Sequence, residues 1–156
     1  MNSISSNKSS HLSGDLDVPG DKSISHRSLI VGSMVSGRIE IDNLLESEDV
    51  IATADALKTL GVKLNKVNDK WEVFGSGIGN FFGSNYTLNM GNSGTGARLL
   101  MGLVAGSDVE ATFIGDKSLS KRPMKRITSP LKKTGATIGN QTNNLPIKIK
   151  GNKIVL

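Results

Sequence analysis

Hydrophobic and polar positions along the chain follow two periods, one typical of helices and the other of strands. Residues 23–35 and the stretch from Ser47 to Leu60 place apolar side chains at helical spacing. Three shorter stretches alternate with a period of two and predict strands, at residues 38–42, 62–64 and 71–74. The first half of the chain is therefore predicted to run helix, strand, helix, strand, strand.

The same order of patterns returns in the second half. A helix, a strand, a second helix and closing strands are predicted at residues 91–104, at 109–114, from about Arg122, and up to 147–150. The second helices also end alike, because residues 57–64 read LKTLGVKL and residues 131–138 read LKKTGATI. A shared order and a shared phrase indicate one supersecondary unit used twice. We expect an α/β fold with α+β layers, in which helices cover one face of each sheet.

The sequence pattern divides the chain into a tail, a short strand and two repeats. They are a disordered Ser/Asn-rich tail over residues 1–10, a short strand over 11–20, and two repeats over about 21–85 and 86–156. Residues 147–156 are strand-like up to the last residue, and an exposed strand edge normally needs a partner. We therefore expect the polypeptide to be incomplete.

The composition of the chain excludes several classes of protein. The chain has 156 residues, 37% hydrophobic residues, a formal net charge of +5 and no Cys, which excludes disulfide scaffolds and thiolate metal sites. The two histidines lie far from ligand spacing, so no metal is expected. The apolar run at residues 99–105 is much shorter than the ~20 residues of a membrane span, and the N-terminus is unlike a secretory signal. These features predict a cytoplasmic protein whose positive charge suits nucleic acid or a small anionic substrate.

The first stretch with candidate chemistry covers residues 19–28, which read PGDKSISHRS. A turn leads there into a helix start, whose open amides and dipole attract anions. Lys22, Ser23 and Arg27 could add an ammonium, a hydroxyl and a bidentate guanidinium. Alternatively, Ser23 or Ser25 only caps the helix, and the cations are solvated. The spacing is not that of a Walker loop.

The second stretch covers residues 91–98, which read GNSGTGAR. Its glycines would let an anionic ligand approach the backbone at a helix start, with Arg98 one turn further on. The glycine order differs from that of the Rossmann motif. A flexible turn without a ligand is the alternative.

The third stretch covers residues 115–124, which read GDKSLSKRPM. Pro123 suits the first position of a helix, so Lys117, Lys121 and Arg122 would crowd a helix N-terminus. Cations are unfavourable there unless a bound anion compensates them. This placement favours a ligand over a solvated face.

In this order and approximate spacing, PGDKSISHRS, GNSGTGARL and GDKSLSKRPM resemble the 5-enolpyruvylshikimate-3-phosphate (EPSP) synthase family, and its second, bacterial class in particular. The resemblance runs from about Leu12 to the C-terminus, although the chain is under half the family's usual length. It implies an enolpyruvate transferase-like α/β prism, whose two lobes each contain three βαβαββ units. The chain would hold about two units of one lobe, and residues 11–20 would form a strand of the other, largely absent lobe.

The resemblance also implies an activity. The family, also called 3-phosphoshikimate 1-carboxyvinyltransferases, transfers the enolpyruvyl group of phosphoenolpyruvate to the 5-hydroxyl of shikimate 3-phosphate, in aromatic amino-acid biosynthesis. It needs no cofactor, its full-length members are expected to be monomers, and glyphosate mimics its phosphoenolpyruvate. Its acid and base groups would lie beyond this chain, so we expect no catalytic residue here and no activity of the chain alone.

The motif match also implies binding roles for individual residues. Lys22 would lie between both substrates, Ser23 and Arg27 would hold shikimate 3-phosphate, and Gly94 and Arg122 would bind phosphoenolpyruvate. Asn92, Thr95 and Arg98 would line the same region.

Two other functions remain open on sequence alone. One is the related enolpyruvyl transferase acting on UDP-N-acetylglucosamine, although its nucleophilic cysteine loop is not seen here and its N-terminal motifs differ. The other is a small basic nucleic-acid-binding module. An aromatic content of 4% leaves little for base stacking, and the cations cluster at helix starts rather than along one stripe. We therefore expect no nucleic-acid partner.

Overall fold

The computed structural model describes residues 3–139 and 143–152. The elements follow in the order α1 (Lys22–Met34), β1 (Ser36–Ile41), α2 (Glu48–Thr59), β2 (Lys63–Val67), β3 (Lys70–Ser76), β4 (Phe82–Asn89), α3 (Gly94–Ala105), β5 (Asp108–Ile114), the 3-10 turn η1 (Leu119–Lys121), α4 (Lys125–Lys133), β6 (Thr137–Gly139) and β7 (Ile147–Lys150). The predicted order of helix, strand, helix, strand, strand thus occurs from α1 to β3 and again from α3 to β7, with η1 inserted before α4.

The two sheets repeat one pairing pattern. In the first sheet β3 lies between β1 and β2, and both pairings are antiparallel. In the second sheet β7 lies between β5 and β6 in the same way, and β4 adds a parallel strand on the outer side of β5. The sequence analysis did not predict β4, although Phe82, Tyr86 and Leu88 lie two or four residues apart there; Gly83, Ser84 and Asn85 interrupt the pattern, and Leu88 is the one buried residue of this strand.

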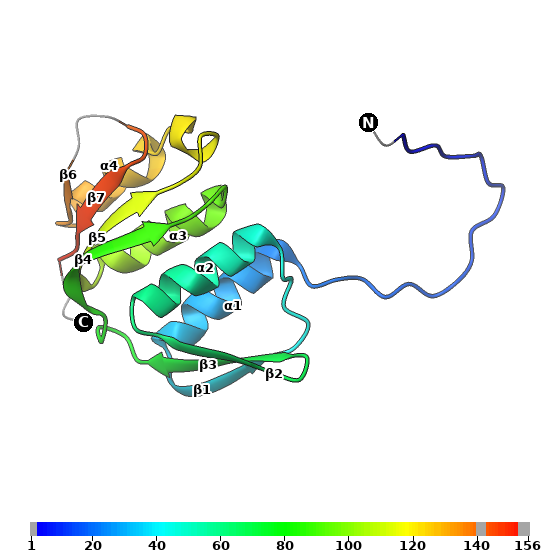
Figure 1. The fold of residues 1–156 in the computed structure, drawn as a ribbon, viewed down its shortest axis with the longest axis horizontal. Helices are drawn as coiled ribbons and strands as arrows, with labels where there is room; N and C mark the ends of the chain where they lie inside the picture. Colours follow the sequence, from blue (N-terminus) through cyan, green and yellow to red (C-terminus); the bar gives the residue numbers. More distant parts are fainter. Residues whose placement is uncertain (1–2, 140–142, 153–156) are drawn as a thin grey trace.

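The strand predicted over residues 11–20 is absent from the structure. This segment is extended chain outside any helix or strand, and Leu12, Leu16 and Val18 are exposed (Figure 1). A strand is held by a hydrogen-bonded ladder, and no strand within the described residues pairs with this segment. Whether it joins another lobe stays a prediction.

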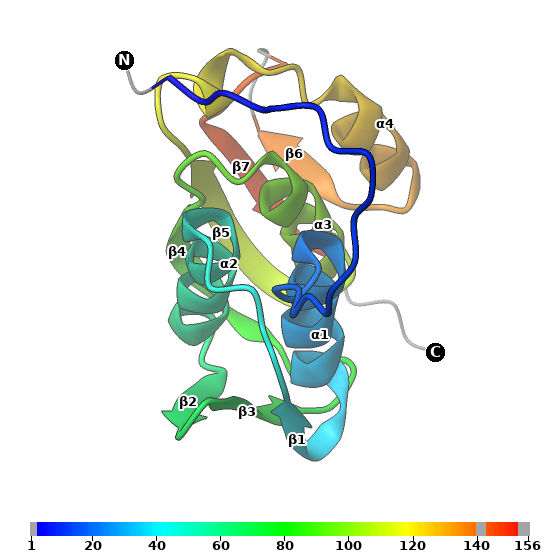
Figure 2. The same ribbon diagram turned by 90° about the vertical axis from the view of Figure 1, so that its right-hand side faces the viewer.

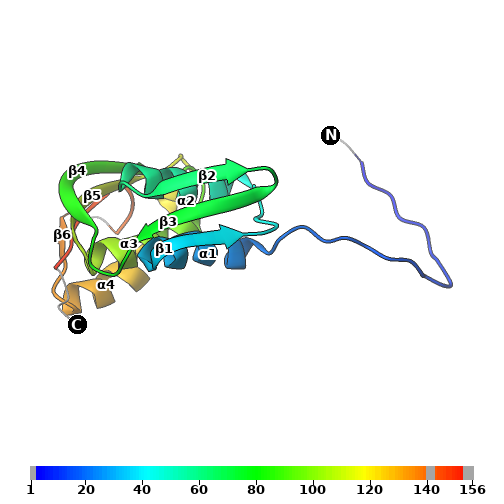
Figure 3. The same cartoon turned by 90° about the horizontal axis from the view of Figure 1, so that it is seen from below.

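Helices α1, α2 and α3 lie against one another between the two sheets (Figure 1). Figure 3 shows the β1–β3–β2 sheet in front of α1 and α2, while α3 packs on β5 and β7. The core consists of apolar side chains from both repeats, including the fully buried Leu29, Val50, Leu57, Val73, Leu100, Met101, Val104 and Phe113. All three helices begin at the same end of the molecule, on the right in Figure 1 and facing the viewer in Figure 2. The fold therefore places three helix N-termini on one face.

The prediction that a helix begins near Arg122 is wrong. Arg122 has extended dihedral angles (φ −80°, ψ 133°), and α4 begins only at Lys125. The residue before a proline is kept out of the helical region, which places Arg122 in a loop before Pro123. The cations of this stretch therefore surround η1 instead of crowding a helix start.

Gly75 of β3 tests the packing between α1 and the first sheet, and Gly102 of α3 is a control outside that interface. A Cβ on Gly75 would lie 2.2 Å from the carbonyl oxygen of Val35 and 2.3 Å from that of Gly32, whereas a Cβ on Gly102 would meet nothing within 4 Å. We expect Gly75→Ala to lower the free energy of unfolding by about 3 kcal/mol, because backbone must move. Gly102→Ala should raise it by up to about 1 kcal/mol through helix propensity. Urea denaturation followed by circular dichroism measures both, and equal stability of the two variants would contradict the packing.

Candidate anion-binding site

The three stretches singled out in the sequence lie at the end of the molecule where α1, α2 and α3 begin (Figures 1 and 2). Residues 19–28 lead into α1, residues 91–98 lead into α3, and residues 115–124 form the loop after β5. A helix N-terminus carries unsatisfied amides and a partial positive charge, so this end of the molecule favours anions before any side chain is counted.

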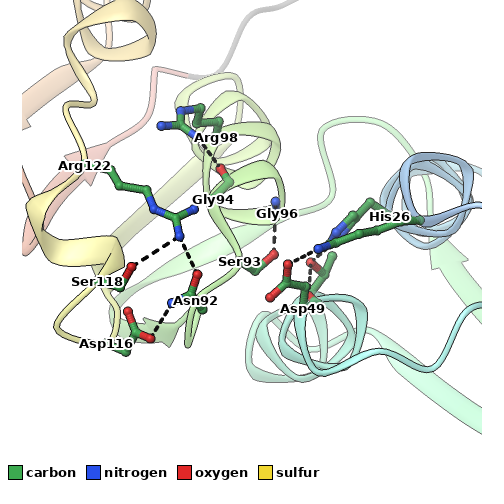
Figure 4. Close-up of polar contacts among 12 residues, drawn as sticks. His26, Asp49, Asn92, Ser93, Gly94, Gly96, Arg98, Asp116, Ser118 and Arg122 are labelled. Carbon is green, nitrogen blue, oxygen red and sulfur yellow. Dashed lines mark hydrogen bonds and ion pairs between the residues drawn. The ribbon is translucent and has the colours of Figure 1, made fainter. Parts of the chain in front are cut away.

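The loops before α3 and after β5 are joined by hydrogen bonds. Arg122 Nη2 donates to Asn92 Oδ1 at 2.5 Å and to Ser118 Oγ at 3.3 Å. Asn92 Nδ2 donates in turn to Asp116 Oδ2 at 2.6 Å. Figure 4 shows this chain of contacts beside the start of α3. The guanidinium of Arg122 is thereby held across from the second stretch.

Two guanidiniums meet at Gly94. A Cβ on Gly94 would lie 2.9 Å from Arg98 Nη1 and 3.0 Å from Arg122 Nη1. Arg98 Nη1 also donates to the Gly94 carbonyl at 3.0 Å (Figure 4). Neither arginine forms an ion pair with a carboxylate in the described part of the chain. Two unneutralised cations beside a helix start are a suitable site for an anion.

The partial burial of Arg98 makes its positive charge less favourable. The pKa of Arg98 lies below its ordinary value, first because the side chain is desolvated and second because Arg126 and Arg122 repel its charge. Its Nε is buried, with no hydrogen-bond partner among the described residues. A bound anion would offset the repulsion between these guanidiniums.

The first stretch is organised differently from the expectation. Asp21 caps α1, since its Oδ1 accepts the amide of Ile24 at 2.8 Å, so the alternative that Ser23 or Ser25 caps the helix is wrong. Arg27 Nη1 donates to the Ser23 carbonyl at 2.9 Å, as Arg98 does to the Gly94 carbonyl. The two helix starts thus repeat one arginine geometry.

Helix α2 connects the first two stretches. Lys22 forms an ion pair with Asp49 at the start of α2. One turn further, the fully buried His26 has its Nδ1 2.9 Å from Thr53 Oγ1. A Cβ on Gly96 would lie only 2.3 Å from the same Thr53 oxygen, so α3 approaches α2 closely there. Sequence reasoning missed these contacts, because Lys22 and Asp49, like His26 and Thr53, lie 27 residues apart along the chain.

The structure brings some of the predicted site residues together and leaves others apart. Asn92, Gly94, Arg98 and Arg122 form one group. Lys22, Ser23, Arg27 and Thr95 lie at the same end of the molecule, but no hydrogen bond or ion pair between described residues joins them to this group.

The surface hollows divide in the same way. Arg122 lines a surface hollow of about 630 Å³ together with Lys117 and Lys121. Arg27 lines another of about 340 Å³ between α1 and α3.

Comparison with known proteins shows to which protein family this chain is related. The family model for EPSP synthase (3-phosphoshikimate 1-carboxyvinyltransferase) matches residues 6–155. The chain belongs to the EPSP synthase family. A 3-phosphoshikimate 1-carboxyvinyltransferase of Parvibaculum lavamentivorans is 49% identical over 96% of this chain and 34% of its own length. One from Afipia carboxidovorans is 50% identical over 92% of the chain and 33% of the relative.

A solved structure agrees with these relatives. The EPSP synthase of Acinetobacter baumannii matches with a TM-score of 0.81 and 39% identity, over 89% of this chain and 32% of that one. The predicted family and the predicted enolpyruvate transferase-like α/β fold are thereby confirmed. The chain spans about a third of the length of these EPSP synthases.

Metal coordination and membrane insertion need features that can be checked in the described residues. Within residues 3–139 and 143–152, no group of three or more His, Asp or Glu side chains could hold a metal ion. In the same ranges, no helix combines the length and the apolar character needed to cross a bilayer.

The buried His26 makes the stability of the fold depend on pH. Burial is the main cause that lowers the pKa of His26 from its ordinary value of 6.5; Lys22 and Arg27 add to this, and Asp49 opposes it. The folded state thus favours the neutral ring, so stability is fully present above pH 6.5 and is lost as pH falls toward the folded pKa. We expect the free energy of unfolding to drop between pH 7.5 and pH 5.5, by at most about 1.4 kcal/mol per pH unit.

Urea denaturation at both pH values measures this dependence. His26→Gln should flatten it, whereas His11→Gln, a change at an exposed histidine, should leave it intact. An unchanged pH slope in His26→Gln would show that another group is responsible.

Proposed function

We propose that this chain supplies part of the substrate site of an enzyme that transfers the enolpyruvyl group of phosphoenolpyruvate to the 5-hydroxyl of shikimate 3-phosphate. The observation that carries the proposal is the pair of guanidiniums of Arg98 and Arg122 beside Gly94, without a carboxylate partner among the described residues. Membership in the EPSP synthase family supports the choice of substrates. The names of the relatives favour it over the transferase acting on UDP-N-acetylglucosamine.

The chemistry of the substrates explains why such a site needs fixed cations. Phosphoenolpyruvate carries a phosphate and a carboxylate, and shikimate 3-phosphate carries the same two groups. Two such anions repel each other at the short distance that reaction requires. Cations and helix-start amides that are already in place can offset this repulsion without reorganising during the reaction.

The predicted binding residues divide between the two substrates. Gly94 and Arg122 would bind phosphoenolpyruvate at the start of α3, where Arg98 and Asn92 also lie. The remaining assignments follow the motif match, with Ser23 and Arg27 on shikimate 3-phosphate, Lys22 between the substrates and Thr95 in the first turn of α3.

The proposed reaction adds and then eliminates. The 5-hydroxyl oxygen bonds to C2 of phosphoenolpyruvate while a proton adds to C3, and the hydroxyl proton leaves. Phosphate then departs from C2 as C3 loses a proton, which restores the double bond. The residues described here bind and orient the anions, and they stabilise the phosphate as it leaves. We assign them no proton transfer, and we expect the protein to work in the cytoplasm, as a monomer, without a cofactor.

Binding of phosphoenolpyruvate tests the proposal directly. We expect titration with phosphoenolpyruvate to shift the amide signals of residues 92–98 in a nuclear magnetic resonance spectrum. Arg122→Ala should weaken the affinity at least about ten-fold, because a charge-assisted contact is lost. Arg38→Ala, which removes an exposed arginine of β1 outside the site, is the matched control. Shifts confined to other surfaces, or equal affinities of the two variants, would contradict the assignment.

The space at Gly94 yields a second prediction, on glyphosate. A methyl group on Gly94 would press on the ends of two flexible arginine side chains, so the protein should still fold. We expect Gly94→Ala to raise the half-inhibitory concentration of glyphosate about ten-fold, which corresponds to about 1.4 kcal/mol of crowding. The assay uses a chimera in which residues 6–155 replace the matching third of the Parvibaculum lavamentivorans enzyme. An equal half-inhibitory concentration of glyphosate for the active chimeras with Gly94 and with Gly94→Ala would refute the crowding.

A further inference from the structure

We propose that Asp116 is a positioning residue for Arg122, which it orients through the side-chain amide of Asn92. This inference rests on the proposed function, since it concerns the arginine assigned to phosphoenolpyruvate. Asp116 was not among the site residues predicted from the sequence, and it makes no direct hydrogen bond to Arg122. The hydrogen bonds between the two residues pass through the neutral side chain of Asn92, and the charge of Arg122 also acts on Asp116 directly.

Asp116 occupies a junction between the two loops. Its Oδ1 accepts the amide of Leu119, the first residue of η1, at 2.6 Å. Its Oδ2 accepts Asn92 Nδ2 at 2.6 Å (Figure 4). Its backbone amide also donates to the Gly91 carbonyl at 2.8 Å. Asp116 therefore fixes Asn92 relative to the loop that carries Arg122.

The charge of Asp116 decides which way the amide of Asn92 points. The pKa of Asp116 lies below its ordinary value, mainly because of the Leu119 amide and then the Asn92 side chain, so the group is an acceptor only at neutral pH. Arg122 can only donate. Asn92 must then direct Nδ2 toward Asp116 and Oδ1 toward Arg122. The opposite orientation would place like groups against each other at both ends.

The Asn92 side chain also keeps the carboxylate of Asp116 out of hydrogen-bond contact with Arg122. A carboxylate in direct contact with Arg122 would neutralise the charge that an anionic substrate needs. With Asn92 in between, only Arg122 Nη2 is occupied, by Asn92 and Ser118. Nη1 has no hydrogen-bond acceptor in the described residues and lies beside Gly94. The arrangement thus holds the guanidinium in place while leaving its outer edge for a ligand.

The variant Asp116→Asn separates orientation from folding. The substituted side chain could still accept the Leu119 amide through its carbonyl oxygen, but its NH₂ group would face Asn92 and reverse that amide. The reversed amide would present its own NH₂ group to Arg122 and release the guanidinium. The matched control is Asp55→Asn, which makes the same change of charge at an exposed site on α2.

The first measurement needs no ligand. In the ligand-free chain we expect the Arg122 Nε–H signal to be sharp and slow in exchange with water, and to become fast-exchanging in Asp116→Asn but not in Asp55→Asn. Asn92→Ala should have the same effect, since it breaks the relay while leaving the Leu119 contact in place. An Arg122 signal unchanged in Asp116→Asn and in Asn92→Ala would overturn the proposal, and the second variant decides the matter if the first does not fold.

The second measurement is the affinity for phosphoenolpyruvate, with inorganic phosphate as a simpler probe. Asp116→Asn should weaken phosphoenolpyruvate binding at least about five-fold, and Asp55→Asn should leave it unchanged. A loosened Arg122 with unchanged affinity would also overturn the positioning role. If the wild-type chain binds neither probe, the proposed function fails, while the Arg122 signal still decides whether Asp116 holds that side chain.

Discussion

Positive charge without a carboxylate partner, at the end of the molecule where three helices begin, is the feature on which the account of this protein depends. The helix starts contribute unsatisfied amides, and Arg98 and Arg122 contribute guanidiniums beside Gly94. Elsewhere in the described residues, some cations form surface ion pairs, such as those of Arg38 and Lys70, and others, such as Lys132 and Lys133 of α4, are exposed to water. At Gly94, by contrast, two guanidiniums lie close together and Arg98 is partly desolvated, and this unfavourable arrangement supports the proposal that an anion binds there.

The fold keeps this charge in place by packing. Because α1, α2 and α3 contact one another between two sheets, their starts cannot separate without opening the core. Small residues and buried polar contacts set the spacing there, as Gly96 lies against Thr53 and His26 pairs with the same hydroxyl. Outside the helices, the loop that carries Arg122 is tied to the start of α3 by Asp116 and Asn92. The contacts that stabilise this end of the molecule are therefore the ones on which the proposed substrate binding depends.

The sequence predicted the elements with clear periodicity and the loops with dense chemistry. It predicted both repeats of helix, strand, helix, strand, strand, and it identified Arg98 and Arg122, which the structure brings together. It missed β4, in which Gly83, Ser84 and Asn85 interrupt the alternation of apolar residues, and it began α4 too early because it counted Pro123 as helical. Asp116 and Thr53 could not be found from spacing, since their partners lie more than twenty residues away along the chain. Such contacts depend on how loops meet in three dimensions.

The most direct measurement is a crystal structure of the chain soaked with phosphoenolpyruvate. The account predicts a phosphate or carboxylate group at the start of α3, within hydrogen-bond distance of both Arg98 and Arg122 and close to the Gly94 backbone. A ligand bound on another face, with both guanidiniums unchanged and no anion between them, would contradict it.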